Sequence, residues 1–401
     1  MKNKILIVTD FYHPEILGGA EISVKEFKDF LEKDYRVSVF CSTLSNIKLN
    51  ESNVFRFKTS KPIFPNWRII INLKACYYFY KHLKKNKYDL IHFQNISYSI
   101  SYSVLVIGKF FGAKQIITFR DCTVFINGKF DHIVKTGFLK LNFWLLIKNQ
   151  KWRYNPFRNL MIRLFLKCSD HNIAISNILK KTLESNKIKI DSVVYNRIKI
   201  DNNNNGLKQT KLNTDKIVNK NFVNLLFLGR ASKQKGFDDL VKLLPDLKIN
   251  FKNIKLICIG TSYQNISNDL KNFIIKNNLE NSIDFYNWID NFKVYSIVRK
   301  VQLVCFSSRY IDAFGRVITE SICNNVPVII SNLAGAHELI KDEFPELVYN
   351  PLNNNELFIK INHILNNQDD ISKKIINHDK TKYLISEKID YYNSIYKNLL
   401  C

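Results

Sequence analysis

The sequence predicts an α/β protein with two doubly wound, Rossmann-like domains, each built on a parallel β-sheet. Three observations lead to this fold class. Apolar runs of strand length alternate with longer helical stretches through both halves of the chain. At 401 residues the chain is long for a single hydrophobic core. Between the halves lies a polar stretch, 201–220, which has few hydrophobic residues and many turn formers, so we expect a linker there.

The first predicted domain, residues 1–200, opens with the apolar run Lys4–Asp10, then Gly18, Gly19 and a helix. A dinucleotide-binding fingerprint would need G-x-G-x-x-G directly after the strand, so NAD binding is disfavoured. The glycine pair suits either close approach of the backbone to a phosphate or a simple helix entry. Six further strands are expected at 36–42, 53–59, 89–95, 115–121, 171–177 and 191–196.

Two charged residues, Arg120 and Asp121, end the predicted strand 115–121. Open α/β sheets bind their ligands at the carboxyl ends of the strands. A charged pair at this edge is therefore expected to be functional.

The second predicted domain, residues 221–385, repeats the alternation, with a helix expected near 237–244. The last stretch, 386–401, has helical spacing and is expected to join the first domain as a closing helix. Strands of the second domain are expected at 224–230, 254–260, 283–288, 303–308 and 326–331. The apolar face of the closing helix would consist of Ile389, Tyr392, Ile395, Tyr396 and Leu399.

The stretch Ser308–Ser331 joins the last two of these strands and carries most of the functional argument. Gly315 stands where a helix would begin, and the N–H groups of Phe314 and Gly315 there favour an anion such as phosphate. Glu320, about one to two turns into the helix, offers a carboxylate to the paired hydroxyls of a ribose. The alternative is an ordinary strand–helix–strand crossover in which Asp312 and Glu320 are solvated acids.

Two cations, Arg230 and Lys235, flank the turn after the first strand of the second domain. Both are expected to reach the same site as the amides of Phe314 and Gly315. Two cations placed there would stabilise a nucleoside diphosphate as it leaves, as a divalent metal does elsewhere. We expect no metal site.

The composition points to an anionic partner, because the net charge is +25 and the pI is near 9.6. Nucleic acid, an anionic membrane and phosphorylated substrates all satisfy this condition. Eight scattered cysteines without a C-x-x-C pair favour reduced core residues of a cytoplasmic protein. The first apolar run is too short for a signal peptide, and no stretch has the roughly 18 apolar residues that span a bilayer.

Two insertions, 61–87 and 138–167, mix aromatic, apolar and basic residues. Such segments fit an anionic membrane surface, which would place the protein peripherally on the inner face of the cytoplasmic membrane. The alternatives are core-facing helices with solvated lysines, or a nucleic-acid surface, although no nucleic-acid-reading motif accompanies the charge.

Together these motifs resemble glycosyltransferase family 4, whose members are retaining enzymes of the GT-B fold. The resemblance implies two Rossmann-like domains facing across a cleft, with the acceptor on the first and the donor on the second. It rests on Gly18-Gly19, Asn196, and the motifs at 170–176 (DHNIAIS), 229–236 (G-R-x4-K-G), 312–320 (an E-x7-E-like pair of acids), 326–331 (VPVIIS) and 334–340 (AGAHELI).

The resemblance also implies roles for individual residues toward a nucleoside diphosphate sugar, most often a UDP-sugar, with no other cofactor. Arg230 and Lys235 would bind the distal phosphate, and Asp312 would hold sugar hydroxyls; these three form the expected catalytic set. The expected donor-binding set is Gly18, Gly19, Phe314, Gly315, Arg316 and Glu320.

The chain departs from the family in two places. Asp312 stands where the family usually has Glu, which shortens the reach by about 1.5 Å. Arg120 stands where many relatives have His, so Arg120 and Asp121 are assigned to the acceptor side or the phosphate side. The expected mechanism is front-face attack by an acceptor hydroxyl, with the departing phosphate oxygen taking the proton.

The acceptor is expected to be a lipid-linked oligosaccharide in bacterial surface polysaccharide or lipopolysaccharide assembly, with soluble acceptors as the alternative. Two other classes stay open. A catalytically inert nucleotide-sugar binder is favoured by the departures at Asp312 and Arg120. A nucleic-acid-binding protein is favoured only by the charge.

Overall fold

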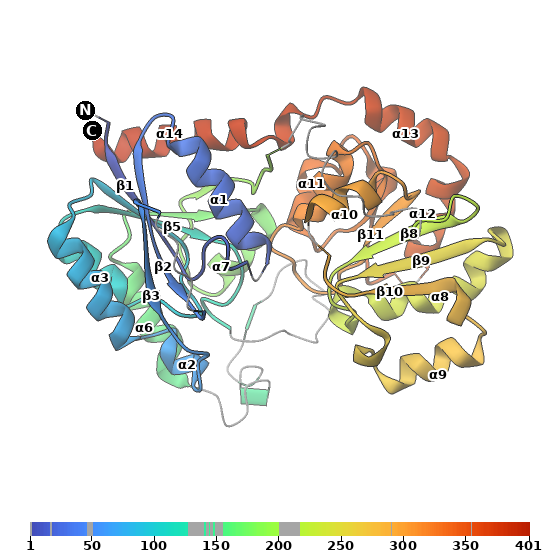
Figure 1. Ribbon diagram of the computed structural model, residues 1–401, viewed down its shortest axis with the longest axis horizontal. Coiled ribbons are helices and arrows are strands. Elements are labelled where there is room, and N and C mark those ends of the chain that lie inside the picture. Colours follow the sequence, from blue (N-terminus) through green and yellow to red (C-terminus); the bar gives the residue numbers. More distant parts are fainter. Residues whose placement is uncertain are drawn as a thin grey trace. The chain divides into compact units, whose positions relative to one another are not determined.

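The computed structural model describes residues 2–16, 18–45, 51–126, 140–141, 144, 147–148, 155–199, 217–289, 291–353 and 355–401 (Figure 1). The chain forms two compact units. The first contains the described residues up to 126, those of 138–198, and the final segment 385–401, whereas the second contains those of 199–384. Most of the predicted linker, 201–216, and much of the insertion 138–167 lie outside the described residues.

The first unit is built on a seven-stranded parallel sheet with the order β3-β2-β1-β4-β5-β6-β7. All seven predicted strands are confirmed. The strand order reverses between β1 and β4, and this switch point is where open sheets bind ligands, at the carboxyl ends. The strands are β1 Lys4–Thr9, β2 Arg36–Thr43, β3 Val54–Lys58, β4 Leu90–Asn95, β5 Lys114–Phe119, β6 His171–Ala174 and β7 Ser192–Val193.

Helices cover both faces of this sheet. Helix α1 (Gly19–Leu31) packs beside the final helix α14 (Ile385–Leu400), and Phe27 and Tyr392 from these helices belong to one buried cluster with alternate strand residues. The opposite face is covered by α3 (Leu73–Lys85), whose Phe79 packs on Phe40 and Phe93. The remaining helices of this unit are α2 Pro65–Arg68, α4 Val104–Phe110, α6 Pro156–Leu166 and α7 Asn177–Ser185.

The second unit is a six-stranded parallel sheet with the order β10-β9-β8-β11-β12-β13. Its switch point lies between β8 and β11. The five predicted strands are confirmed, and the two-residue β13 was missed because so short a strand shows no alternation. The strands are β8 Val223–Leu228, β9 Ile254–Ile259, β10 Ile283–Tyr286, β11 Leu303–Phe306, β12 Val328–Ser331 and β13 Val348–Tyr349.

The helices of the second unit follow its strands in alternation. The α-helices are α8 Phe237–Asn250, α9 Asn268–Lys276, α10 Asn291–Val298, α11 Arg316–Cys323, α12 Glu356–Asn366 and α13 Gln368–Asn377. Short 3-10 helices are η4 Lys233–Lys235, η5 Tyr263–Asn265, η6 Glu280–Ser282, η7 Gly335–Leu339, η8 Pro345–Leu347 and η9 Thr381–Tyr383.

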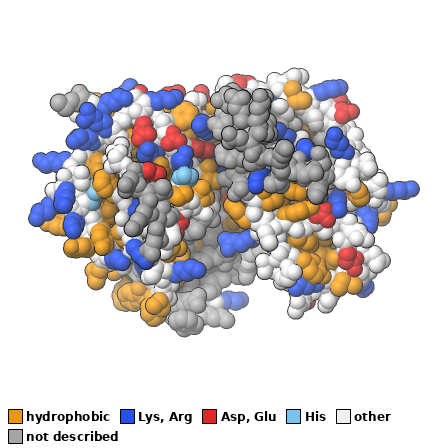
Figure 2. All heavy atoms as spheres, viewed as in Figure 1, with side chains coloured by type: hydrophobic (Ala, Val, Ile, Leu, Met, Phe, Trp, Pro, Cys, Tyr) orange, Lys and Arg blue, Asp and Glu red, His pale blue; other side chains and the backbone are white. Residues whose placement is uncertain are grey.

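Basic side chains are spread over the face of the molecule in Figure 2, as the net charge of +25 requires. Within the part of the chain that the structure describes, no helix combines the length and the apolar character needed to cross a membrane.

Candidate active site

Two loops meet at the switch point of the second unit, one after β8 and one after β11. Gly236 has a φ of +68°, and a Cβ atom there would lie 1.8 Å from the carbonyl oxygen of Ser307, so the position requires glycine. The Ser307 hydroxyl donates to the carbonyls of Lys235 at 3.0 Å and Gly236 at 3.1 Å. The Arg309 N–H donates to the Gln234 carbonyl at 2.8 Å. The two loops are thereby fixed against each other.

This junction brings together Lys235 and Asp312, two of the predicted site residues. Lys235 Nζ lies 2.5 Å from Asp312 Oδ2, and the Tyr310 hydroxyl donates to the same oxygen at 3.4 Å. The ammonium group also lies over the rings of Phe306 and Tyr310, 5.3 and 5.0 Å from their centroids. The side chains of Lys235 and Asp312 are 24% and 17% exposed, so a ligand can still reach them.

The protonation states of this cluster follow from burial and charge. Burial alone would lower the pKa of Lys235, but the neighbouring Asp312 carboxylate and Tyr310 raise it above its usual value. Burial raises the pKa of Tyr310 to about 12. At neutral pH Lys235 is therefore an ammonium ion, and Tyr310 is a phenol that can donate.

Backbone hydrogen bonds hold the loop that carries Asp312 against the turn that follows β12. Asp312 N–H donates to the Leu333 carbonyl at 3.0 Å, and Gly335 N–H donates to the Asp312 carbonyl at 2.9 Å. Ala336 N–H donates to the carbonyl of buried Phe314 at 2.7 Å. These bonds connect the predicted site to the AGAHELI motif and hold the loop in one conformation.

Helix α11 starts directly after this loop and carries a second ion pair. Gly315 has a φ of +85°, and a Cβ there would lie 2.9 Å from both the Phe306 ring and the Ile318 side chain, so glycine is needed here too. Arg316 Nε donates to Glu320 Oε1 at 3.1 Å, one turn along the helix. The structure thus pairs two predicted donor-binding residues, and the second oxygen of Glu320 offers further acceptor capacity.

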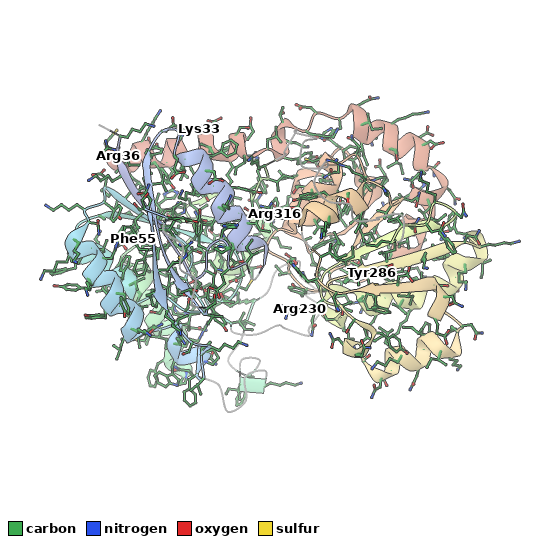
Figure 3. The ribbon with its side chains drawn as sticks, in the orientation of Figure 1. Lys33, Arg36, Phe55, Arg230, Tyr286 and Arg316 are labelled. Atoms are coloured by element: carbon green, nitrogen blue, oxygen red, sulfur yellow. The ribbon has the colours of Figure 1, made fainter. Side chains whose placement is uncertain are left out.

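Arg230 stands apart from both ion pairs. It follows Gly229 at the carboxyl end of β8, and its side chain is exposed (Figure 3). Arg316 lies on a different element, at the start of α11 (Figure 3). Arg230 and Lys235 lie on the same loop after β8.

In the first unit, the glycine pair forms the start of α1. Gly18 has an extended backbone, and its N–H donates to Glu21 Oε2 at 2.9 Å in a capping box. Gly19 is exposed. Glu21 is buried, and this burial raises its pKa. Of the two alternatives, the geometry favours the helix entry for Gly18; sequence reasoning missed Glu21, although its spacing of three from Gly18 fits a capping box.

Arg120 lies in a buried polar network at the carboxyl edge of the first sheet. Its Nε and Nη2 donate to Gln94 Oε1 at 3.1 and 2.6 Å, and its Nη1 donates to Asn196 Oδ1 at 3.1 Å. The same Asn196 oxygen accepts from Lys388 Nζ at 3.2 Å, and Lys388 is fully buried in α14. Two cations therefore converge on Asn196. Lys388 was missed because a lysine in a terminal helix is usually solvated.

Asp121 caps the turn that follows Arg120. Its Oδ1 accepts from the N–H of Thr123 at 2.9 Å and from the Thr123 hydroxyl at 2.5 Å. The buried Arg158 donates to the carbonyls of Thr123 and Val124, which holds the same turn. The contacts give Asp121 a turn-capping position, while Arg120 faces the polar network.

A further carboxyl group at this edge, Asp10, was not predicted. It ends β1, is fully buried, and accepts from the backbone N–H groups of Tyr98, Ser99 and Ile100 at 2.7, 2.7 and 2.8 Å. Burial raises its pKa to about 6. Its place at the end of the first apolar run was the only signal in the sequence.

Two family descriptions match the chain, one on each half. Glycosyltransferase Family 4 matches residues 17–201, and Glycosyl transferases group 1 matches residues 209–384. The first range contains Gly18 and Arg120, and the second contains both ion pairs described above.

Three proteins illustrate the similarity. An uncharacterized 41.2 kDa protein in the cps region of Klebsiella pneumoniae is 26% identical, over 79% of this chain and 81% of its own. The capsular polysaccharide biosynthesis glycosyltransferase CapM of Staphylococcus aureus is 26% identical, over 45% of this chain and 48% of its own. The crystal structure of Anabaena HepE in complex with UDP and glucose has the same fold, with a TM-score of 0.68 at 16% identity over 98% of this chain and 99% of that one.

Proposed function

Because the chain belongs to the group 1, family 4 glycosyltransferases and has their GT-B fold, we propose that it is a retaining, metal-independent enzyme. Its donor would be a UDP-sugar, and its acceptor a hydroxyl group of a lipid-linked glycan at the cytoplasmic face of a bacterial membrane. The product would enter surface polysaccharide or lipopolysaccharide assembly. The CapM and cps-region relatives support the pathway class, and the UDP complex of HepE supports the donor class.

The observation that carries the proposal is the cluster of Lys235, Asp312 and Tyr310 at the switch point of the second sheet. An ammonium group has three donors, so Lys235 can keep its contact with Asp312 and still donate to a phosphate oxygen. Arg230, on the same loop, would add a second positive charge. Together these cations would supply the charge that a divalent metal supplies in other transferases.

The remaining site residues would hold the substrates. One oxygen of Glu320 would stay with Arg316 while the other accepts from a ribose hydroxyl. The α11 start at Phe314 and Gly315 would face the phosphates, and Gly19 is proposed as a further donor-binding residue. Arg120 and Asp121 would serve the acceptor side, Arg120 through the network that includes Lys388.

In the proposed reaction one carbon–oxygen bond forms, another breaks, and one proton moves from the acceptor hydroxyl to the leaving group. The acceptor hydroxyl oxygen would attack the anomeric carbon from the face that the diphosphate leaves. The carbon–oxygen bond to the phosphate would break, and the departing phosphate oxygen would take the hydroxyl proton. Lys235 and Arg230 would stabilise the charge that develops on the diphosphate, so no enzymatic nucleophile is required.

The test is a thermal-shift titration of the purified protein with UDP, GDP and DNA, each with EDTA and with magnesium. UDP at a hundred times its dissociation constant should add about 2.7 kcal/mol of stability, in EDTA as well as in magnesium. Lys235→Ala should abolish most of this shift and lower turnover by about a hundredfold or more. Lys233→Ala removes an exposed cation from the same turn and should change neither.

Each other outcome selects another function. Stabilisation by UDP without transfer to any lipid-linked acceptor would identify an inert nucleotide-sugar binder. Stabilisation by DNA alone would mean that the charge of the chain serves nucleic acid. Transfer with an inverted anomeric configuration, read by proton NMR of the product, would contradict the front-face mechanism.

A further inference from the structure

The first unit exposes a run of large apolar side chains between β3 and α3. Five of them, Ile63, Phe64, Trp67, Ile71 and Leu73, fall within eleven residues and are between 48% and 85% exposed. Large apolar side chains scattered singly on a surface are ordinary, but a continuous cluster marks a binding surface. We refer to residues 63–73 as the apolar segment.

The apolar segment is held in place by its inner residues. Ile69 and Ile70 are buried, and their carbonyls accept from the N–H groups of Tyr102 at 3.0 Å and Ser103 at 3.2 Å. Arg68 donates to the carbonyl of Ser60 at 2.7 Å. The fold therefore presents the outer side chains to solvent while fixing the backbone beneath them.

The surroundings of the apolar segment are basic. Residues 61–87 contain seven Lys or Arg residues and no Asp or Glu. Helix α3 continues the segment with exposed Tyr77, and the ammonium group of Lys81 lies 6.0 Å from the centroid of that ring. The other exposed lysines of α3 are Lys74, Lys84 and Lys85.

The neighbouring helices extend the same surface. Helix α4 packs beside α3 and exposes Phe110, and α6 packs beside α4. The exposed apolar residues of α6, Phe157, Leu160 and Leu164, have helical spacing and form one stripe. Figure 2 shows hydrophobic side chains gathered at the end of the first unit where Figure 1 places α2.

The apolar segment lies at the carboxyl edge of the first sheet. It follows the carboxyl end of β3, and the Asn72 side chain donates to the Ser99 carbonyl at 2.5 Å. Ser99 in turn belongs to the loop that Asp10 holds at the end of β1. This is the edge that also carries Arg120, so the apolar surface and the proposed acceptor side occur on the same edge of one sheet.

We propose that the apolar segment inserts into the surface layer of an anionic lipid bilayer, with the lysines of α3 on the lipid headgroups. Trp, Phe and Tyr beside Lys and Arg are the side chains that occupy the membrane–water interface, and each basic group favours anionic lipid. The inference rests on the proposed function, because a membrane-embedded acceptor would then present its glycan to the edge that carries Arg120 while its lipid stays in the bilayer.

The test is sedimentation with vesicles of phosphatidylcholine alone or with about a third phosphatidylglycerol, at low and high salt. The full-length protein should bind the anionic vesicles at least tenfold more tightly, and salt should weaken this binding. The variant Ile63→Ser, Phe64→Ser, Trp67→Ser, Leu73→Ser should lose at least tenfold in affinity. A matched control, Ile249→Ser with Ile275→Ser, removes exposed apolar side chains from the second unit and should bind as the wild type.

A second readout locates the contact without relying on the fourfold variant. Brominated lipids quench nearby tryptophans, so anionic brominated vesicles should quench the wild type. Trp67→Phe should lose much of this quenching, whereas Trp288→Phe, at an exposed position of the second unit, should keep it.

The outcomes separate this inference from the proposed function. Absence of vesicle binding together with a UDP-induced thermal shift would overturn the membrane surface and leave the donor proposal standing. Vesicle binding without any UDP-induced thermal shift would contradict the donor proposal and leave the membrane surface standing. If the fourfold variant instead converted a dimer into a monomer and bound vesicles normally, the apolar segment would be a contact between copies of the chain, and the inference would be wrong.

Discussion

Asp10 shows how one buried carboxyl group can organise the ligand edge of a sheet. Three consecutive backbone N–H groups, those of residues 98–100, donate to its two oxygens. These bonds favour the carboxylate, but burial outweighs them and raises the pKa from 3.8 to about 6. The group is therefore ionised at neutral pH and becomes protonated in mild acid, and its charge affects the stability of the first unit.

The sign of this effect can be tested with Asp10→Asn. Because the folded pKa lies above the unfolded value, the contribution of Asp10 to the free energy of unfolding is largest well below pH 4 and falls as the pH rises through 6. A pKa raised from 3.8 to about 6 corresponds to about 3 kcal/mol, which is fully present only well below pH 4. The stability difference between wild type and Asp10→Asn should therefore shrink by about 2 kcal/mol from pH 4 to pH 7, because the unfolded carboxyl is already largely ionised at pH 4.

The measurement is urea unfolding followed by tryptophan fluorescence in a Trp288→Phe background, which removes the tryptophan of the second unit. The free energy of unfolding of Asp10→Asn should also be lower by about 1–3 kcal/mol at every pH, because the amide nitrogen of Asn would face a backbone N–H or leave one unpaired. A difference that does not vary between pH 4 and pH 7 would mean that Asp10 titrates normally.

The sequence could predict a site residue where that residue belongs to a motif. It could not do so where the importance of the residue comes from a contact in the folded chain. The motif pattern pointed to Lys235 and Asp312 separately, but their ion pair depends on two loops, 77 positions apart, meeting at a switch point. Lys388 and Asp10 carry no motif, since their importance comes from burial. The roles of all the site residues in catalysis are still predictions.

At the scale of elements, the two loops of the second unit act as one piece. Gly236 lets the first loop pass close to Ser307, whose hydroxyl donates to the carbonyls of Lys235 and Gly236. The positions of Lys235 and Asp312 depend on this junction, because each lies within one or a few residues of it. A change at Gly236 should therefore disturb the site as well as the fold.

Gly236→Ala is expected to destabilise the second unit by about 3 kcal/mol or more. Its Cβ would lie 1.8 Å from a backbone oxygen, so the loops must separate, and the positive φ adds its own strain. Gly112→Ala is the matched control, because its φ of +75° is similar but no atom lies within 4 Å of the added Cβ. The control should cost only about 1 kcal/mol in thermal unfolding; equal losses would show that strain alone decides.

Elements with a clear period were predictable from the sequence. Buried parallel strands are short apolar runs, so twelve of the thirteen strands in the described residues were expected, and two-residue β13 was not. The insertion 61–87 was expected either to fit an anionic membrane surface or to pack on the core, yet only the structure shows which of its side chains are exposed. Exposure depends on which helix packs next to which, and the sequence of one helix does not contain that information.

At the scale of the whole molecule, the chain returns to the first unit after completing the second. Helix α14 places Tyr392 and Tyr396 in the core against the first sheet, and the Tyr396 hydroxyl lies 2.5 Å from Nδ1 of His92, which is 304 positions earlier in the chain. His92 Nε2 lies 2.8 Å from Thr118 Oγ1, which bonds the Tyr392 hydroxyl at 2.9 Å. The stability of the first unit thus depends on the last residues of the chain.

Tyr396→Ala should therefore destabilise the first unit alone. Loss of a fully buried aromatic side chain typically costs about 3–5 kcal/mol, and here it also removes the hydrogen bond between the Tyr396 hydroxyl and His92 Nδ1. In hydrogen exchange, slowly exchanging amides of β1, β4 and α1 should then exchange faster, whereas those of β8 and β9 keep their rates, because they belong to the other unit. Lys397→Ala, at an exposed position of the same helix, should leave both sets nearly unchanged. Faster exchange in β8 and β9 with Tyr396→Ala would show that the two units unfold together, and α14 would then stabilise the whole chain rather than one sheet.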